Sequence, residues 1–78
     1  MSEVAQRVKQ VVVQTLKVDP SRVTDEASFV EKLGAESIQS IELVAAFEEE
    51  FDIDMDEDVA LAVQTVGGAV KYIEDMLK

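Results

Sequence analysis

Three stretches of this chain repeat apolar side chains at the spacing of an α-helix, which constrains the fold more than any other feature. The pattern covers residues 3–16, residues 37–51 and the segment that follows Thr65. A chain of 78 residues has room for one small core, so these helices must pack on one another. We therefore predict a single all-α domain over residues 1–78. Its expected architecture is a small four-helix bundle, three longer helices and one short helix, with a long loop between helices one and two.

The first helix and the loop after it are predicted from separate signals. Residues 3–16 carry the helical stripe Val4, Val8, Val11, Val12 and Leu16. Asp19-Pro20 is typical of an N-cap followed by proline at the first helical position, which predicts one short turn up to Val23. Residues 17–36 are otherwise irregular, and loops of this length in small domains tend to be packed or functional. The side chains expected to hold this loop on the core are Val23, Phe29, Val30 and Leu33.

The second helix is expected from Ser37 to about Phe51. At 100° per residue, with Ile38 at 0°, one arc of roughly 140–240° faces the core. This arc holds Leu43, Phe47, Phe51 and Val44. The opposite, outward arc mixes acidic and apolar side chains, with Ile38, Gln39, Glu42, Ala46 and Glu49 on it and Ala45 and Glu48 beside it.

Two further helices complete the chain. Asp56 to Asp58 are placed to cap and charge the start of a short third helix that runs through Val63. Thr65 caps the fourth helix, although Gly67-Gly68 in its first turn costs about 1 kcal/mol for each glycine relative to alanine. The expected buried stripe is Val66, Ala69, Val70, Ile73 and Leu77, with Tyr72 to one side.

The composition excludes most catalytic chemistry. The chain has no cysteine and no histidine, which removes disulfides, thiolate ligands, a cysteine nucleophile, the commonest general base and the commonest zinc ligand. Carboxylates are plentiful, but the helix angles spread them over solvent, where nothing would tune a general acid. We therefore expect neither an enzyme nor a metal site.

The net charge of −10 lies in one segment. Ten of the seventeen acidic residues fall between Glu36 and Asp58, and no Lys or Arg stands between Lys32 and Lys71. Such a charge argues against nucleic acid and anionic membranes as partners and favours a basic protein surface. No stretch is long enough to cross a membrane and no signal peptide opens the chain, so we expect a cytoplasmic protein without membrane insertion. We also expect a monomer.

Ser37 stands where the loop meets the second helix. A serine at such a junction is usually the N-cap of the helix. The N-terminus of a helix also presents free N–H groups and a positive dipole end, which suit a phosphate attached to the serine oxygen. Gly34 would allow a close backbone turn just before it. Both interpretations remain open on these residues alone.

Several segments resemble the acyl carrier protein family in order and spacing. They are residues 30–38 (VEKLGAESI), 41–44 (IELV), 47–52 (FEEEFD), 65–66 (TV), 69–73 (AVKYI) and the run Ser28-Phe29-Val30. The resemblance covers nearly the whole chain. It implies a carrier of acyl intermediates as thioesters for fatty-acid, lipid or polyketide biosynthesis. It also implies that Ser37 accepts a covalent 4′-phosphopantetheine arm from coenzyme A through a holo-synthase, the phosphopantetheinyl transferase.

The same resemblance assigns expected roles to two further sets of residues. Basic-surfaced acyl-transfer and chain-elongation enzymes would recognise Glu36, Ile38, Gln39, Glu42, Ala45, Ala46, Glu48 and Glu49. The acyl chain would lie between helices, with Phe29, Val30, Phe47, Met55, Ala60 and Val63 as the walls of its pocket.

The sequence departs from the pattern of this family at several of these positions. Glu36-Ser37-Ile38 replaces the usual Asp-Ser-Leu, Gln39 replaces an acidic residue, and Ala45 replaces a frequent methionine. Met55-Asp56 stands where Ile-Pro is common, and Leu61 and Ala62 occupy positions that are often charged. This cluster of changes suggests a specialised carrier with its own set of partners.

Three alternatives belong to other classes. Alternating aspartates from Asp52 resemble a calcium-binding EF-hand loop, but the sixth and twelfth positions hold Glu57 and Val63 instead of Gly and Glu, which excludes that motif. Loose binding of divalent ions to this acidic cluster, through charge relief, stays open. An unmodified acidic interaction module, with Ser37 only as a helix cap, remains possible. So does a peptidyl or polyketide carrier domain, although the short length and the helices at both ends favour a free-standing protein.

Overall fold

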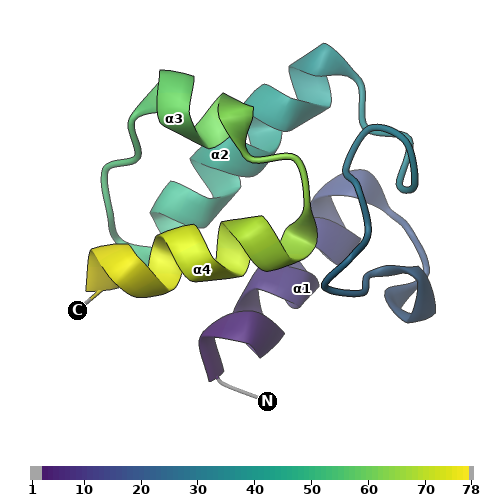
Figure 1. Cartoon of the computed structure of the whole chain (residues 1–78), viewed down its shortest axis with the longest axis horizontal. Coiled ribbons are helices and arrows are strands. Elements are labelled where there is room, and N and C mark those ends of the chain that lie inside the picture. Colours follow the sequence, from purple (N-terminus) through teal and green to yellow (C-terminus); the bar gives the residue numbers. More distant parts are fainter. Residues whose placement is uncertain (1–2, 78) are drawn as a thin grey trace.

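The structure is a computed structural model that describes residues 3–77, which form four α-helices and one 3-10 turn (Figure 1). The elements are α1 (Glu3–Leu16), η1 (Pro20–Arg22), α2 (Ser37–Phe51), α3 (Glu57–Ala62) and α4 (Val66–Leu77). The predicted all-α bundle with a long first connection is confirmed, and α1 and α2 have the predicted bounds. Helix α3 ends one residue earlier than predicted, because Val63 has extended backbone angles (φ −74°, ψ 120°).

The core lies where α1 meets α2 and α4, while α3 packs against α2. The largest fully buried side chains are Val8, Val12, Val66 and Ile73. On α2 the predicted core-facing arc is confirmed, with Leu43, Phe47 and Phe51 buried and Val44 half-buried. None of the described helices has the length and apolar character needed to span a bilayer.

Two residues predicted to be buried are exposed. Leu77 is 46% exposed because it is the last residue of α4, where the end of the helix leaves it without cover. Val30 is 63% exposed because it stands in a turn whose neighbours Phe29 and Leu33 take the inward positions. The turn is closed by the Gly34 N–H, which donates to the Val30 carbonyl at 3.2 Å.

The predicted N-terminal caps of η1, α3 and α4 form. The Asp19 carboxylate accepts hydrogen bonds from the Ser21 backbone N–H (2.9 Å) and the Ser21 hydroxyl (2.8 Å), which start η1 and lower the pKa of Asp19. Asp56 accepts from the Asp58 N–H at 3.0 Å at the start of α3. Thr65 Oγ1 accepts from the Gly68 N–H at 3.1 Å at the start of α4.

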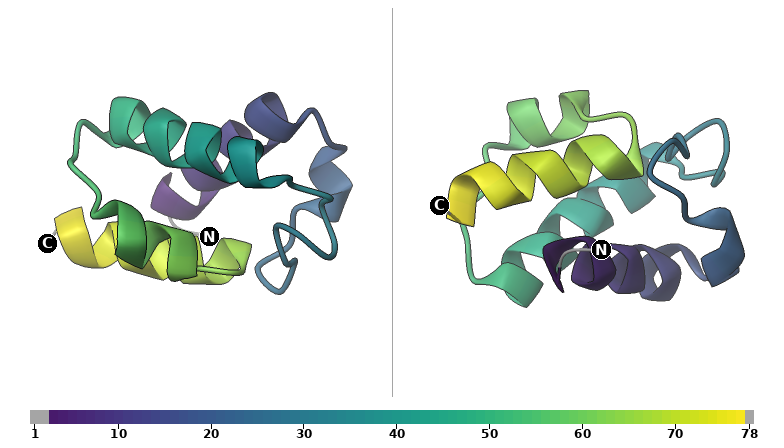
Figure 2. Two further views of the ribbon diagram at one scale, coloured as in Figure 1. Left: turned by 90° about the horizontal axis from the view of Figure 1, so that it is seen from above. Right: turned by 60° about the horizontal axis from the view of Figure 1, so that its bottom comes forward.

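The long loop is fastened to the start of α4. The Phe29 N–H donates to the Gln64 carbonyl (3.0 Å), and the Val66 N–H donates to the Ala27 carbonyl (3.0 Å). Ser28 and Thr65 form an isolated antiparallel bridge between these bonds. The two views of Figure 2 show the consequence: the loop closes one end of the bundle, and α2 and α4 both begin at that end.

The opposite end of α2 is held by Arg7 of α1. The Arg7 guanidinium donates to the Glu50 carboxylate at 2.9 Å and to the Glu50 carbonyl at 2.6 Å. It also lies 4.6 Å from the centre of the Phe51 ring. A cation at the C-terminal carbonyls of a helix and over an aromatic face is favourable on both counts. The C-terminal end of α2 is thus fixed by α1.

Gly67 is required by the contact between the loop and α4. Its N–H donates to the Asp25 carbonyl at 2.8 Å, and a Cβ at this position would lie 2.9 Å from the same oxygen. Gly67→Ala should therefore destabilise the protein, because the loss from forcing the two backbones apart, about 1–3 kcal/mol, is larger over most of its range than the gain of about 1 kcal/mol in helix propensity. For each kcal/mol by which the free energy of unfolding falls, we expect the thermal unfolding midpoint to fall by roughly 4–8 °C, measured by circular dichroism.

Gly68→Ala is the matched control. Its Cβ would approach two side-chain atoms, Thr65 Oγ1 at 3.2 Å and Val63 Cγ1 at 3.3 Å, which can move by a few tenths of an ångström. Its midpoint should therefore fall less than that of Gly67→Ala. Equal midpoints for the two variants would show that the Asp25 contact does not determine the residue at position 67.

Candidate functional site

Ser37 is the first residue inside α2, and the N-cap is Glu36, whose backbone is extended (φ −86°, ψ 169°). The Gln39 side chain accepts a hydrogen bond from the Glu36 N–H at 2.9 Å, as the third helical residue does in a capping box. The usual interpretation of a serine at this junction, that Ser37 itself is the N-cap, is therefore wrong here. The cap lies one residue earlier because Gln39 provides the acceptor for the Glu36 N–H.

The Ser37 side chain is exposed, and its hydroxyl makes no hydrogen bond with any residue in the described range 3–77. The backbone before it is fixed, since Ala35 is buried and its N–H donates to the Phe29 carbonyl at 2.8 Å. Gly34 adopts a left-handed conformation (φ +71°) with open space around it. The site therefore presents a free hydroxyl on a rigid support, next to the unpaired N–H groups of the first turn of α2.

The eight predicted recognition residues differ in how far they are available to a partner. The exposed ones are Glu36, Ile38, Glu42, Ala45 and Glu49. The half-buried ones are Gln39, Ala46 and Glu48. Gln39 is engaged in the cap, Ala46 packs against the core, and the Glu48 carboxylate accepts from the Met55 N–H at 3.0 Å. Ile41 is 51% exposed and was not among the predicted recognition residues. Its helical angle places it between Ser37 and Ala45 on the outer side of α2, which could have indicated it.

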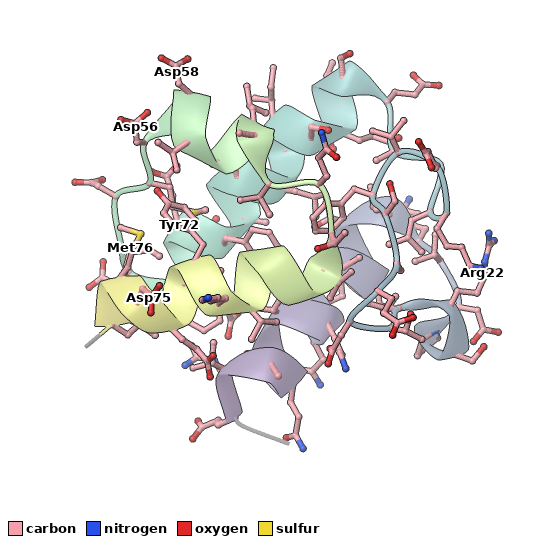
Figure 3. All side chains as sticks on the ribbon, in the orientation of Figure 1. Arg22, Asp56, Asp58, Tyr72, Asp75 and Met76 are labelled. Atoms are coloured by element: carbon pink, nitrogen blue, oxygen red, sulfur yellow. The ribbon has the colours of Figure 1, made fainter. Side chains whose placement is uncertain are left out.

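The acidic segment, residues 36–58, forms few salt bridges with the rest of the described chain. Glu50 pairs with Arg7, and the other salt bridge among the described residues, Lys9–Asp25, lies outside the segment. Glu42 and Glu49 are exposed and form no ion pair or hydrogen bond within the described chain. Asp56 and Asp58 stand at the tip of α3 (Figure 3). No group of acidic side chains among the described residues is arranged to hold a metal ion.

A cavity of about 280 Å³ lies between the loop, α2, α3 and α4. All six residues predicted as pocket walls line it: Phe29, Val30, Phe47, Met55, Ala60 and Val63. Nine lining residues were not predicted, namely Ser28, Glu31, Ser40, Leu43, Val44, Leu61, Gln64, Ala69 and Tyr72. The helical spacing could have indicated Tyr72 as a lining residue, because it lies three residues after the buried Ala69 and therefore on the same side of α4.

Comparison with known proteins places this chain in a class. The family described as "phosphopantetheine attachment site" matches residues 6–73. This chain therefore contains a phosphopantetheine attachment domain, and the exposed Ser37 lies within the matched range. The acyl carrier protein of Phenylobacterium zucineum (strain HLK1) is 52% identical over 77 residues, which cover 99% of this chain and 98% of that protein. Acyl carrier proteins of two Caulobacter vibrioides strains (NA1000 / CB15N and ATCC 19089 / CIP 103742 / CB 15) are 51% identical over 75 residues, covering 96% of each chain.

The chain belongs to the acyl carrier protein family. The prosthetic group implied by this family is a covalent 4′-phosphopantetheine. The residues present fit such a group: the hydroxyl of Ser37 is free, and the N–H groups and positive dipole end of α2 suit a phosphate at that oxygen.

Proposed function

We propose that Ser37 carries the 4′-phosphopantetheine arm and that the protein presents acyl groups on it to biosynthetic enzymes. The observation that supports this most is the exposed, unpartnered hydroxyl at the first residue of α2, in a chain that belongs to the acyl carrier protein family. When bound, the arm supplies the terminal thiol that this sequence lacks, and acyl groups are held on it as thioesters.

The attachment step needs a separate enzyme. In this step Ser37 Oγ bonds to the phosphorus of the pantetheine phosphate of coenzyme A, and adenosine 3′,5′-bisphosphate leaves. The hydroxyl proton must pass to a base on the transferase, because the chain has no histidine and no carboxylate hydrogen-bonded to Ser37 in the described residues. The protein is thus the substrate of that enzyme and acts as a non-catalytic carrier.

The surfaces around Ser37 support a role in delivery. Glu42 and Glu49 are unpaired acids on the exposed face of α2, which favours partners with basic surfaces. The exposed Leu61 (43%) and Ala62 on α3 support the specialised set of partners suggested by the sequence. The cavity supports storage of the acyl chain between the helices. A monomer in the cytoplasm remains the prediction made from the sequence.

The proposal is tested by intact mass. Incubation of the unmodified protein with coenzyme A and a phosphopantetheinyl transferase should add the mass of one phosphopantetheine, and peptide mapping should locate it on Ser37. A second transferase of different specificity guards against a poor enzyme match. If neither transferase adds mass to the folded protein, the alternative of an unmodified interaction module replaces the proposal.

A further inference from the structure

The cavity has a near end and a far end relative to Ser37. At the near end lie Ser28 and Val30 of the loop: Ser28 is bridged to Thr65 at the start of α4, and the Val30 carbonyl accepts from the N–H of Gly34, three residues before α2. From Ser40 to Phe47 the cavity follows α2 for roughly 10 Å. The Met55 N–H is bound to the Glu48 carboxylate at 3.0 Å, which places Met55 beside the end of this stretch. An acyl chain that enters near Ser37 would therefore end close to Phe47 and Met55.

Tyr72 lies at this far end. It is half-buried, lines the cavity from α4, and lies roughly 9 Å along the helix from Val66, where α4 meets the loop. Figure 3 shows it on the side of α4 that faces the connection between α2 and α3. Its hydroxyl has no hydrogen-bond partner among the described residues, so no polar contact within the chain accounts for the position of its ring.

The volume of the cavity gives the length of chain that would fit. An apolar cavity of about 150 Å³ holds one benzene molecule, or roughly 25 Å³ for each carbon atom. At that density a cavity of about 280 Å³ has room for roughly ten carbon atoms. Buried alkyl surface stabilises the folded state only while it is removed from water. A longer chain should therefore add no further stability unless the far end opens.

We propose that the ring of Tyr72 closes the far end of the cavity and sets the length of the acyl chain that this carrier shields, at roughly ten carbon atoms. The inference rests on the proposed function, since it assumes that the arm on Ser37 delivers the chain. The hydroxyl of Tyr72 is not needed for this role, because the role depends only on the space that the Tyr72 ring fills.

The test measures the thermal unfolding midpoint of the protein loaded with saturated acyl chains of increasing length. A transferase loads each chain from its acyl-coenzyme A, and intact mass confirms the loading. In the unaltered protein the midpoint should rise with each added carbon pair and become constant near ten carbons. In Tyr72→Ala the rise should continue for about four more carbons, because the ring volume becomes available. Tyr72→Leu provides a second enlarged variant in case Tyr72→Ala does not fold.

Tyr72→Phe is the matched control, since it keeps the ring and removes only the hydroxyl. Its midpoint should become constant at the same length as in the unaltered protein. The inference is overturned if Tyr72→Ala and Tyr72→Leu keep the original limit, or if Tyr72→Phe shifts it as far as they do. A loaded protein whose midpoint does not depend on chain length also overturns it, while the carrier function stands. If no arm is attached at all, the proposed function fails and the inference with it.

Discussion

Ser37→Ala should abolish attachment of the arm completely while leaving the bundle intact. The substitution removes the only oxygen through which the phosphodiester can form at this position. The hydroxyl makes no hydrogen bond with the described residues, and the helix is capped by Glu36 and Gln39. We therefore expect the free energy of unfolding to change by less than about 0.5 kcal/mol, as for other exposed positions, in place of the roughly 1 kcal/mol that loss of a cap would cost. Intact mass after incubation with coenzyme A and a transferase measures the first effect, and thermal unfolding the second.

Ser40→Ala is the matched control for this variant. Ser40 lies one turn further along α2, and its hydroxyl donates only a long hydrogen bond of 3.4 Å to the Glu36 carbonyl. It should still gain one phosphopantetheine. Mass gain in Ser37→Ala would show that another residue carries the arm. A large loss of stability in Ser37→Ala would instead show that the serine supports the helix, contrary to the capping geometry.

The helices of this fold could be predicted because their sequence signals are local. Periodicity alone set the bounds of α1 and α2, and Asp19-Pro20 and Asp56 marked the starts of η1 and α3 through caps that form within three residues. The six predicted pocket walls all line one cavity, and this set came from the resemblance to a known family and not from helical periodicity. Their role in holding an acyl chain stays a prediction.

What the sequence pattern missed has two sources: surroundings supplied by distant parts of the chain, and, at the start of α2, a local choice between two neighbouring cap residues. Leu77 continues the buried stripe of α4, but it is 46% exposed because the described residues cover only part of it at the end of the helix. The Asp25 carbonyl that requires Gly67 is forty-two residues away in sequence. The helical pattern could therefore show only that this glycine lowers helix propensity, and not that the contact with Asp25 requires it. The usual N-cap interpretation of Ser37 is wrong by one residue: serine is the commoner cap, but here the Glu36 N–H donates to the Gln39 side chain, which favours Glu36 as the cap.

The double substitution Glu42→Lys and Glu49→Lys should weaken binding to a basic partner by roughly tenfold to a hundredfold, equivalent to about 1.4–2.7 kcal/mol. Both carboxylates are exposed and unpaired within the described chain, so their replacement breaks no contact that holds the fold. Glu48 is not suited to this experiment, because its carboxylate binds the Met55 N–H and its loss would disturb the start of α3. The KM of the protein as a substrate of the transferase, measured at low ionic strength, is the readout.

The matched control is Glu3→Lys with Glu26→Lys, which makes the same change in net charge at two exposed positions away from α2. If recognition depends on local charge, this control should change KM much less than the α2 variant. Added salt should raise the KM of the original protein towards that of the α2 variant, because charges at an exposed interface are screened within about 10 Å at 0.1 M salt. Equal effects from the two double variants would show that only net charge steers the encounter. Indifference to both salt and the α2 substitutions would contradict recognition through the acidic face, and would direct the search to the exposed apolar residues Ile38 and Ile41 on the same helix.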